Sequence, residues 1–490
     1  MENIHNLIEI PKAPKESCIN SFQKYILNNF NFETISKLSS SGQLEQIFLR
    51  GMAWKIFLDV LPVNESLEKW KENLSYLRAS YKIISDKITK QQNFFEQEDK
   101  KKVEYNNDIK TDYLRKKSIV FNPFRPEKET KKLINLDLNR TFKELKLFHE
   151  EKINNMLSHI LYLWSLENPD VGYQQGMNDI VSIIFLALYP YYFENNLIEK
   201  NNSNNKAEEL YLFFNDEKEL ESDLYICFNN AMKKGIKEFY EFEFKSKEKQ
   251  DEYINKICLF PKEIENNKEI NDELNLPLII RCSLLINEKL KILDKELYTH
   301  FNKIGLDCSI CLQRWLKCIF NREFELKDVM ILWDDIFSSV NINSDYVLYK
   351  IDLIALAMIL RIRNFLLMCD QSQCFMMLLQ YQKLENILEL IIFADKLDES
   401  IRELVSGKKS LFIDNITSFI SNFDIQKEKN NENKIGEIDN KDITNTSQLI
   451  KSYDQGVEKL KNIFNKYHSL MEINDQKEFN NIIQFFNNYK

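Results

Sequence analysis

The sequence of 490 residues predicts an all-α fold, and three observations support that prediction. Glycine and proline number only nine each, whereas β-sandwiches, barrels and dinucleotide-binding sheets use many turn glycines. Apolar residues recur three and four positions apart along most of the chain, which is the period of one helix face. We find no convincing strand run and no repeat period. The apolar fraction of 44% is typical of a globular protein with room for two or three domains.

The first part of the chain predicts two helices and an irregular segment. We expect residues 1–43 to be a loosely ordered lead-in that ends in a weak helix. Helical spacing of apolar residues predicts a strong helix over residues 44–62, where Pro62 ends it. A second helix is predicted over residues 67–88. Residues 86–132 are charged and contain two X-Pro breaks, so we interpret them as an insertion.

The middle of the chain predicts three further helices. Apolar residues from Ile153 to Trp164 lie on one helix face, and Asn168-Pro169 ends that helix. A very apolar helix follows up to about Leu188, and another amphipathic helix covers residues 220–231. Residues 245–275 are polar, and we interpret them as a second insertion.

The last part predicts long apolar helices followed by a tail. The expected helices cover residues 284–302, 308–320, 329–336, 346–367 and 374–393. The main domain is therefore expected to span residues 44–395. Residues 396–446 are rich in Lys, Glu and Asn in their second half and predict a partly flexible linker. Residues 447–490 predict a helical tail, which either folds back on the domain or pairs with another helix.

Charge and cysteine content exclude several classes of protein. The formal charge is -9 and no long basic stripe occurs, which argues against a nucleic-acid partner. Nine scattered cysteines and a polar start predict reduced thiols in a cytoplasmic protein. Cys308 and Cys311 form a lone CxxC pair with no second pair nearby, which argues against zinc. Cys311 and Cys318, seven residues apart, are interpreted as helix-packing residues. The longest apolar run, residues 180–193, is too short for a transmembrane segment.

Two short stretches contain the chemistry that the rest of the chain lacks. Residues 134–141 place an arginine after a carboxylate, and residues 172–179 place two glutamines before a glycine. Taken singly, the first is usually a surface ion pair and the second a helix boundary. Arginine and glutamine are, however, the side chains that speed GTP hydrolysis. Because residues 406–410 do not make a phosphate-binding loop, the chain is predicted to donate these groups to another protein's site.

In order and spacing, the two stretches resemble the signature of the TBC-domain Rab GTPase-activating proteins. The resemblance covers roughly residues 44–395 and includes Arg50 and Trp54, which we interpret as structural. It also includes residues 221–228, 313–320, 322–324 and 332–334. This family implies an all-α domain of two helical subdomains, here followed by the linker and the helical tail.

The resemblance also assigns roles to individual residues. It implies that Arg140 is an arginine finger and Gln175 a glutamine finger, with Gln174 as the less favoured candidate for the second role. Asp137, one helical turn before Arg140, is expected to orient it. The supporting positions of the second stretch are Tyr173, which positions the loop, and Gly176, which permits a tight turn before the next helix.

The function that the resemblance implies is activation of GTP hydrolysis by a Rab-family small GTPase in its GTP-bound form, in vesicle-mediated and intracellular protein transport. The partner would hold GTP and Mg, so this chain would bind no cofactor and would not itself be a GTPase. The protein would be cytoplasmic, with recruitment to endomembranes through partners left open. The alternative is a non-catalytic Rab-binding scaffold on the same fold; the presence of both fingers favours activity.

Overall fold

The computed structural model describes residues 7–103, 127–194, 206–242, 244, 246–259, 276–339 and 346–407. In these residues the regular structure is helical, and β-type pairing is limited to two isolated bridges. The prediction of an all-α fold is therefore confirmed. One compact unit comprises residues 1–368 and 375–410, and the contacts described below lie within it. Most of the expected linker and the whole of the expected tail lie outside the described residues.

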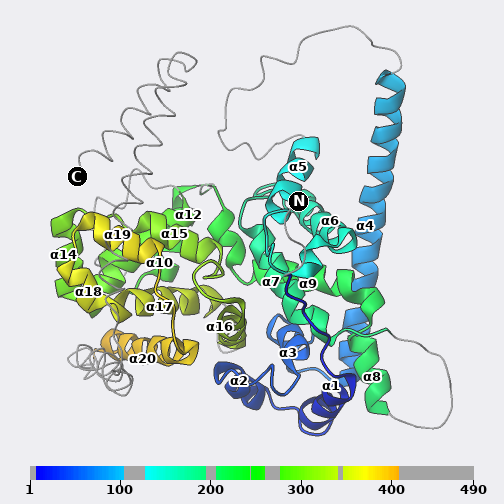
Figure 1. Ribbon diagram of the computed structural model, residues 1–490, viewed down its shortest axis with the longest axis horizontal. Coiled ribbons are helices and arrows are strands. Elements are labelled where there is room, and N and C mark those ends of the chain that lie inside the picture. The colour runs from blue at the N-terminus through cyan, green and yellow to red at the C-terminus, as the bar shows by residue number, and fades with distance from the viewer. Residues whose placement is uncertain are drawn as a thin grey trace. The chain divides into compact units, whose positions relative to one another are not determined.

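The first half of the compact unit is built around one buried helix (Figure 1). Its helices are α1 (Lys15–Phe22), α2 (Phe32–Ser40), α3 (Arg50–Phe57), α4 (Leu67–Val103), α5 (Glu127–Leu138), α6 (Glu151–Glu167), α7 (Met177–Leu188), α8 (Lys206–Phe214) and α9 (Leu220–Lys233). Every residue of α7 is buried, because α3, α6 and α9 pack against it. Helix α7, which begins within the second motif, is thus the centre of this half.

The second half contains the remaining helices. They are α10 (Lys247–Ile257), α12 (Pro277–Leu284), α13 (Lys291–Leu293), α14 (Lys295–Ile304), α15 (Ser309–Lys317), α16 (Leu326–Ser338), α17 (Tyr346–Arg361), α18 (Arg363–Met368), α19 (Gln371–Leu379) and α20 (Ile387–Val405). The apolar helix α17 packs against α20, and α16 contacts both α2 and α3. Helix α16 therefore joins the two halves.

Within the expected lead-in, α2 is the predicted helix at its end, and α1 is an additional packed helix. Helix α1 buries Cys18 and Phe22 completely, and α2 buries Ile35 against α16. The side chain of Asn31 accepts a hydrogen bond from the backbone N–H of Thr34 and so caps α2. Helix α1 is only eight residues long, so its apolar pattern is too brief to be recognised in the sequence.

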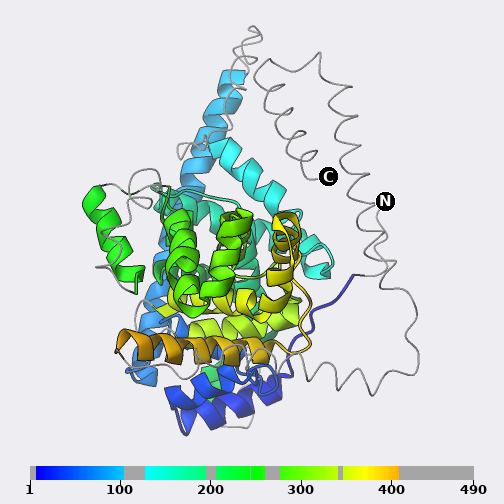
Figure 2. The same ribbon diagram turned by 90° about the vertical axis from the view of Figure 1, so that its left-hand side faces the viewer.

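Two helix ends in the first half differ from the expected ones. The helix predicted over residues 44–62 is reduced to α3, because Phe48 and Asp59 on either side of it have φ values of 54°. A positive φ is incompatible with a right-handed helix. Helix α4 continues to Val103 and so takes up the first part of the expected insertion. Figures 1 and 2 both show α4 running beyond the helices packed against it.

Several helices in the second half are divided or shifted. The helix expected over residues 346–367 is divided into α17 and α18, and the one expected over residues 374–393 is replaced by α19 and α20. Asn386 caps α20 by accepting a hydrogen bond from the backbone N–H of Leu388. In the second expected insertion, α10 buries Tyr253 and Ile254 against α12. That segment therefore belongs partly to the core.

A buried carboxylate joins α3 to α16. Asp334 accepts hydrogen bonds from Arg50 Nε at 3.0 Å and from Trp54 Nε1 at 2.7 Å. The Trp54 ring also stacks on Trp333, with ring centroids 6.0 Å apart. Burial raises the pKa of the Asp334 carboxyl, although the Arg50 guanidinium opposes that shift. Arg50 and Trp54 thus have the structural role that the sequence predicts.

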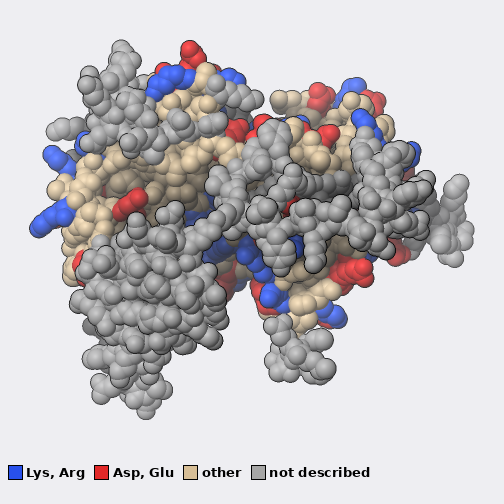
Figure 3. All heavy atoms as spheres, turned by 90° about the horizontal axis from the view of Figure 1, so that it is seen from above, with Lys and Arg blue, Asp and Glu red and all other residues tan. Residues whose placement is uncertain are grey.

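The surface carries charges of both signs. Figure 3 shows Lys and Arg side chains interspersed with Asp and Glu side chains on the visible face. Such mixing is typical of the solvated side of a helical domain. Among the helices that the structure describes, none is long and apolar enough to cross a membrane.

We predict that Asp334→Ala lowers the free energy of unfolding by about 3–5 kcal/mol, because it removes the buried carboxylate that faces the Arg50 guanidinium and leaves that group the largely exposed Glu45. Urea unfolding followed by circular dichroism measures this change. The control is Glu33→Ala, which removes an exposed ion pair to Lys37 on α2 and should cost no more than about 0.5 kcal/mol. Equal effects of the two substitutions would contradict the structural importance of Asp334.

Candidate functional site

The first motif forms the end of α5 and the turn after it. Helix α5 ends at Leu138, and the backbone N–H of Arg140 donates to the carbonyl of Asp137 at 3.1 Å. Phe142, with φ 45°, then turns the chain away from the helix axis. The Arg140 side chain is therefore presented beyond the helix end, where half of its surface is exposed.

The second motif covers the loop between α6 and α7 and the first turn of α7. The last loop residue, Gly176, precedes α7 with φ 107°, a conformation that favours glycine. A Cβ atom on Gly176 would lie 3.1 Å from the hydroxyl oxygen of Tyr240. Gly176 therefore combines a left-handed backbone with a close approach, as the sequence leads us to expect.

One buried carboxylate connects the two motifs. Asp137 accepts from Arg140 Nη2 at 2.5 Å and from the Tyr173 hydroxyl at 2.7 Å, each with a different oxygen. Burial and the nearby Asp137 charge raise the pKa of Tyr173 far above its ordinary value, so its hydroxyl remains a donor. Asp137 thus positions both the arginine and the tyrosine, since it limits the rotamers available to each.

A second link joins Thr141, directly after Arg140, to Asn178, two residues after Gly176. Asn178 Nδ2 donates to Thr141 Oγ1 at 2.8 Å, and Thr141 donates in turn to the carbonyl of Asp137 at 2.8 Å. The Asn178 side-chain oxygen accepts from the backbone N–H of Gly176 at 3.0 Å. The turn that bears Arg140 and the loop that bears the glutamines are therefore hydrogen-bonded to each other at two points.

The two adjacent glutamines have opposite environments. Gln174 is buried and donates through its side-chain amide to the carbonyl of Tyr240. Gln175 is exposed to solvent. An exposed amide can reach a partner's nucleotide, whereas a buried amide that is already hydrogen-bonded cannot do so without breaking its contact. The geometry therefore favours Gln175 over Gln174 for a role in a second protein's site.

A hollow of about 320 Å³ lies beside Arg140. Its lining comprises Arg140, Thr141, Phe142, Asn178, Asp179, Asn321 and Arg322. Arg322 approaches Asp179 at 2.9 Å and is only partly buried. Burial raises the pKa of the Asp179 carboxyl, although Arg322 opposes this shift. The hollow thus contains two guanidinium groups that can bind an anion, whereas Gln175 does not belong to its lining.

Arg322 and Asn178 are site residues to which sequence reasoning assigns no role. Arg322 lies 143 positions from Asp179, so only the fold brings them together. The available signal is indirect, because both residues occur in segments that resemble the TBC family. Asn178 stands inside the second motif, but its part in joining the two motifs depends on the turn that Thr141 adopts.

The chain offers no metal centre in the part that the structure describes. There, no group of three or more His, Cys, Asp or Glu side chains is arranged to hold an ion. Cys308 and Cys311 are buried at the start of α15.

A family model and individual relatives both match this chain, and they indicate the same family. The family model for the Rab-GTPase-TBC domain matches residues 48–260 and 270–368. TBC1 domain family member 5 from Homo sapiens is 28% identical over 384 residues, which cover 77% of this chain and 45% of that protein. GTPase-activating protein GYP1 from Saccharomyces cerevisiae is 24% identical over 299 residues, which cover 61% and 36% respectively. The chain therefore spans less than half the length of these relatives.

A solved structure shares the fold. The Ypt/Rab-GAP domain of Gyp1p superposes with a TM-score of 0.52 at 18% identity. The match covers 80% of this chain and 100% of that domain. The likeness establishes the arrangement of helices.

We predict that Gly176→Ala destabilises the protein more than Gly407→Ala. A left-handed backbone costs an alanine about 1–2 kcal/mol at either position, since φ is 107° and 76°. Only at Gly176 does the new methyl group also meet Tyr240, whereas Gly407 has no atom within 4 Å. Thermal unfolding of the two variants measures the difference, and an equal loss would show that the Tyr240 contact is unimportant.

Proposed function

Because this chain belongs to the Rab-GTPase-TBC domain family, we propose that it accelerates GTP hydrolysis by a Rab-family small GTPase in its GTP-bound form. The observation that carries the proposal is the pair of hydrogen-bonded links between the motifs, through Asp137 and through Asn178. These links hold an exposed arginine and an exposed glutamine on neighbouring segments. GYP1, a relative of this chain, is itself described as a GTPase-activating protein.

In this proposal Arg140 is the arginine finger. Phosphoryl transfer spreads negative charge over the oxygens of the transferred group, and a planar guanidinium can hydrogen-bond several of them at once. Asp137 holds the Arg140 side chain through Nη2, while half of that side chain remains accessible. The finger is thus positioned before the partner arrives, so less side-chain freedom is lost on binding.

Gln175 is the glutamine finger in the same proposal. Its amide has an oxygen that can accept the proton of the attacking water and an N–H₂ group that can donate to the nucleotide. Gly176 supports this role, since its left-handed turn separates the exposed Gln175 from the buried start of α7. Gln174 anchors the loop through Tyr240.

The partner supplies the remaining chemistry. The Rab GTPase would hold GTP and Mg, so this chain would contribute side chains and no bound cofactor. We propose residues 44–395 as the domain responsible, acting in vesicle-mediated transport on membranes to which partners recruit it. The alternative is a scaffold that binds a GTP-loaded Rab without accelerating hydrolysis, and a broad panel of Rab GTPases distinguishes the two by rate and by binding.

We predict that Arg140→Ala lowers the activated hydrolysis rate by about 10³- to 10⁵-fold, the contribution of an arginine finger. Phosphate release from a responsive Rab GTPase under single-turnover conditions measures it. Arg140→Lys keeps the charge but not the planar fork, so it should restore only a small part of the rate. Wild-type rates in both variants would remove Arg140 from the mechanism, and binding without activation by the wild-type protein would favour the scaffold.

We predict different consequences for substitution of the two glutamines. Gln175→Ala should abolish most activation while leaving the melting temperature unchanged, because the side chain is exposed. Gln174→Ala should instead lower the melting temperature, because it removes the buried hydrogen bond to Tyr240. Hydrolysis assays and thermal unfolding of both variants test this contrast. The opposite pattern would transfer the finger role to Gln174.

A further inference from the structure

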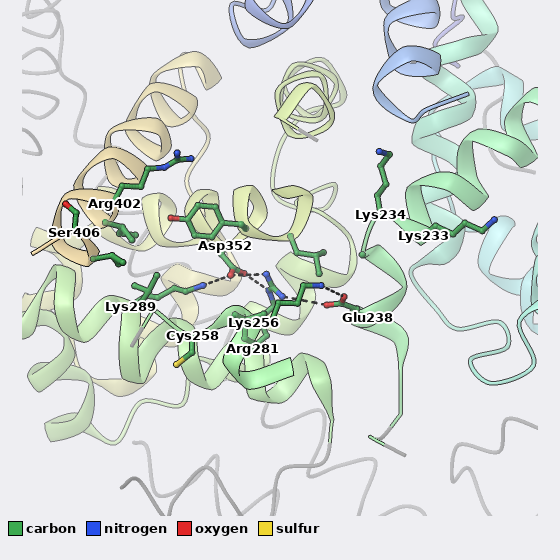
Figure 4. A pocket seen from close by; sticks show the side chains of 17 residues that line it. Lys233, Lys234, Glu238, Lys256, Cys258, Arg281, Lys289, Asp352, Arg402 and Ser406 are labelled. Atoms are coloured by element: carbon green, nitrogen blue, oxygen red, sulfur yellow. Dashed lines mark hydrogen bonds and ion pairs between the residues drawn. The ribbon is translucent and has the colours of Figure 1, made fainter. Parts of the chain in front are cut away.

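A larger hollow, of about 720 Å³, is lined mainly by the second half of the compact unit, apart from the motifs (Figure 4). It is lined by the end of α9, by η6 (Ile236–Tyr240), α10, α12 and η8 (Leu285–Leu290), and by α17 and α20. This volume lies in the range of small-molecule sites, roughly 300–1,000 Å³. The proposed GTPase-activating function gives it no role.

The floor of this hollow contains two buried cations that share one carboxylate. Asp352 accepts from Arg281 Nε at 2.7 Å and from Lys289 Nζ at 2.6 Å. The side chains of Arg281 and Lys289 are 3% and 2% exposed, and that of Asp352 is 1% exposed. Figure 4 shows both cations directed at Asp352. One negative charge therefore faces two positive charges away from solvent.

Other charged side chains adjoin this buried group. Glu238 pairs with Lys256 at 3.4 Å and lies 4.0 Å from Arg281. The buried Glu288 accepts from Cys258 Sγ at 3.0 Å and from the backbone N–H of Leu259 at 2.9 Å. The excess of positive charge is therefore confined to the floor, where Arg281 and Lys289 share Asp352. Two further cations of the lining, Lys234 and Arg402, have acidic partners outside it, Asp59 and Asp398.

Lys289 has hydrogen-bonding capacity that the described residues do not use. An ammonium group has three N–H donors. Within the described part of the chain, Asp352 is the acceptor that contacts Lys289 Nζ. Donors buried without acceptors are costly, and an anion with several oxygens would satisfy them.

The rest of the wall is apolar. Leu348 on α17 and Ile401 and Val405 on α20 line it, so a ligand with a carbon skeleton can contact them while its anionic group reaches the floor. We propose that this hollow binds a small organic phosphate, either free or as the headgroup of a lipid. Its phosphate oxygens accept from Lys289 and Arg281, and Lys256 contacts it at the rim.

Two arms of one experiment test this proposal and distinguish the sources of the phosphate. Isothermal titration with inositol hexakisphosphate probes a free organic phosphate. Flotation with phosphatidylcholine vesicles, with and without phosphatidylinositol bisphosphate, probes a headgroup. Saturable one-to-one binding in either arm supports the proposal, and no binding in both arms overturns it. Because the whole chain is acidic, with a formal charge of -9, general attraction of a polyanion is weak.

Matched lysine variants locate the binding. Lys289→Met removes the buried charge at similar side-chain length and should weaken affinity at least tenfold. Lys256→Met at the rim should weaken the affinity several-fold. If Lys289→Met does not fold, the Lys256→Met variant still tests the proposal. The control is Lys37→Met, an exposed lysine on α2, which should bind like the wild type. If both pocket variants bind like the control, the proposal is wrong. The readout is binding, so this test is independent of GTP hydrolysis.

Discussion

The complete burial of α7 is the constraint on which the site depends. Helices α3, α6 and α9 surround it, so its first residue and the loop before it have little freedom to shift. Asn178 and Asp179, both on the first turn of α7, hold Thr141 and Arg322 respectively. A rigid apolar helix thus positions polar groups that come from distant parts of the chain, and these groups in turn position the exposed Arg140.

A helix could be predicted from the sequence wherever its apolar pattern is long and a glycine or proline marks its end. Helices α6 and α7 follow the expected pattern, because Asn168-Pro169 and Gly176 separate them. The break between α19 and α20 could not be predicted, since residues 380–386 contain neither glycine nor proline. The short helices α1 and α2 depend on contacts with distant helices for their stability, which no local pattern reveals.

The residues of the candidate site could be predicted from the sequence, but their burial and their contacts with distant residues could not. Spacing alone places Asp137 one turn before Arg140, and the structure joins them. The order Gln174-Gln175 does not reveal which side chain is buried, because that depends on Tyr240, 66 positions away. Arg322 likewise reaches the hollow only through tertiary packing. The reactive side chains therefore lie in two short stretches of sequence, whereas the direction in which each side chain points depends on the whole fold.

The contact between Gly176 and Tyr240 also ties the two halves of the domain together. The Tyr240 hydroxyl donates to the carbonyl of Lys317, at the end of α15, at 2.6 Å. That carbonyl lies only 3.7 Å from where a side chain at position 176 would begin. These three positions therefore form a steric unit that constrains sequence divergence. Shortening residue 240 would relieve only the close contact, because a side chain at position 176 would still be strained by its φ of 107°. Glycine is therefore the constrained member of the three, whatever residue 240 becomes.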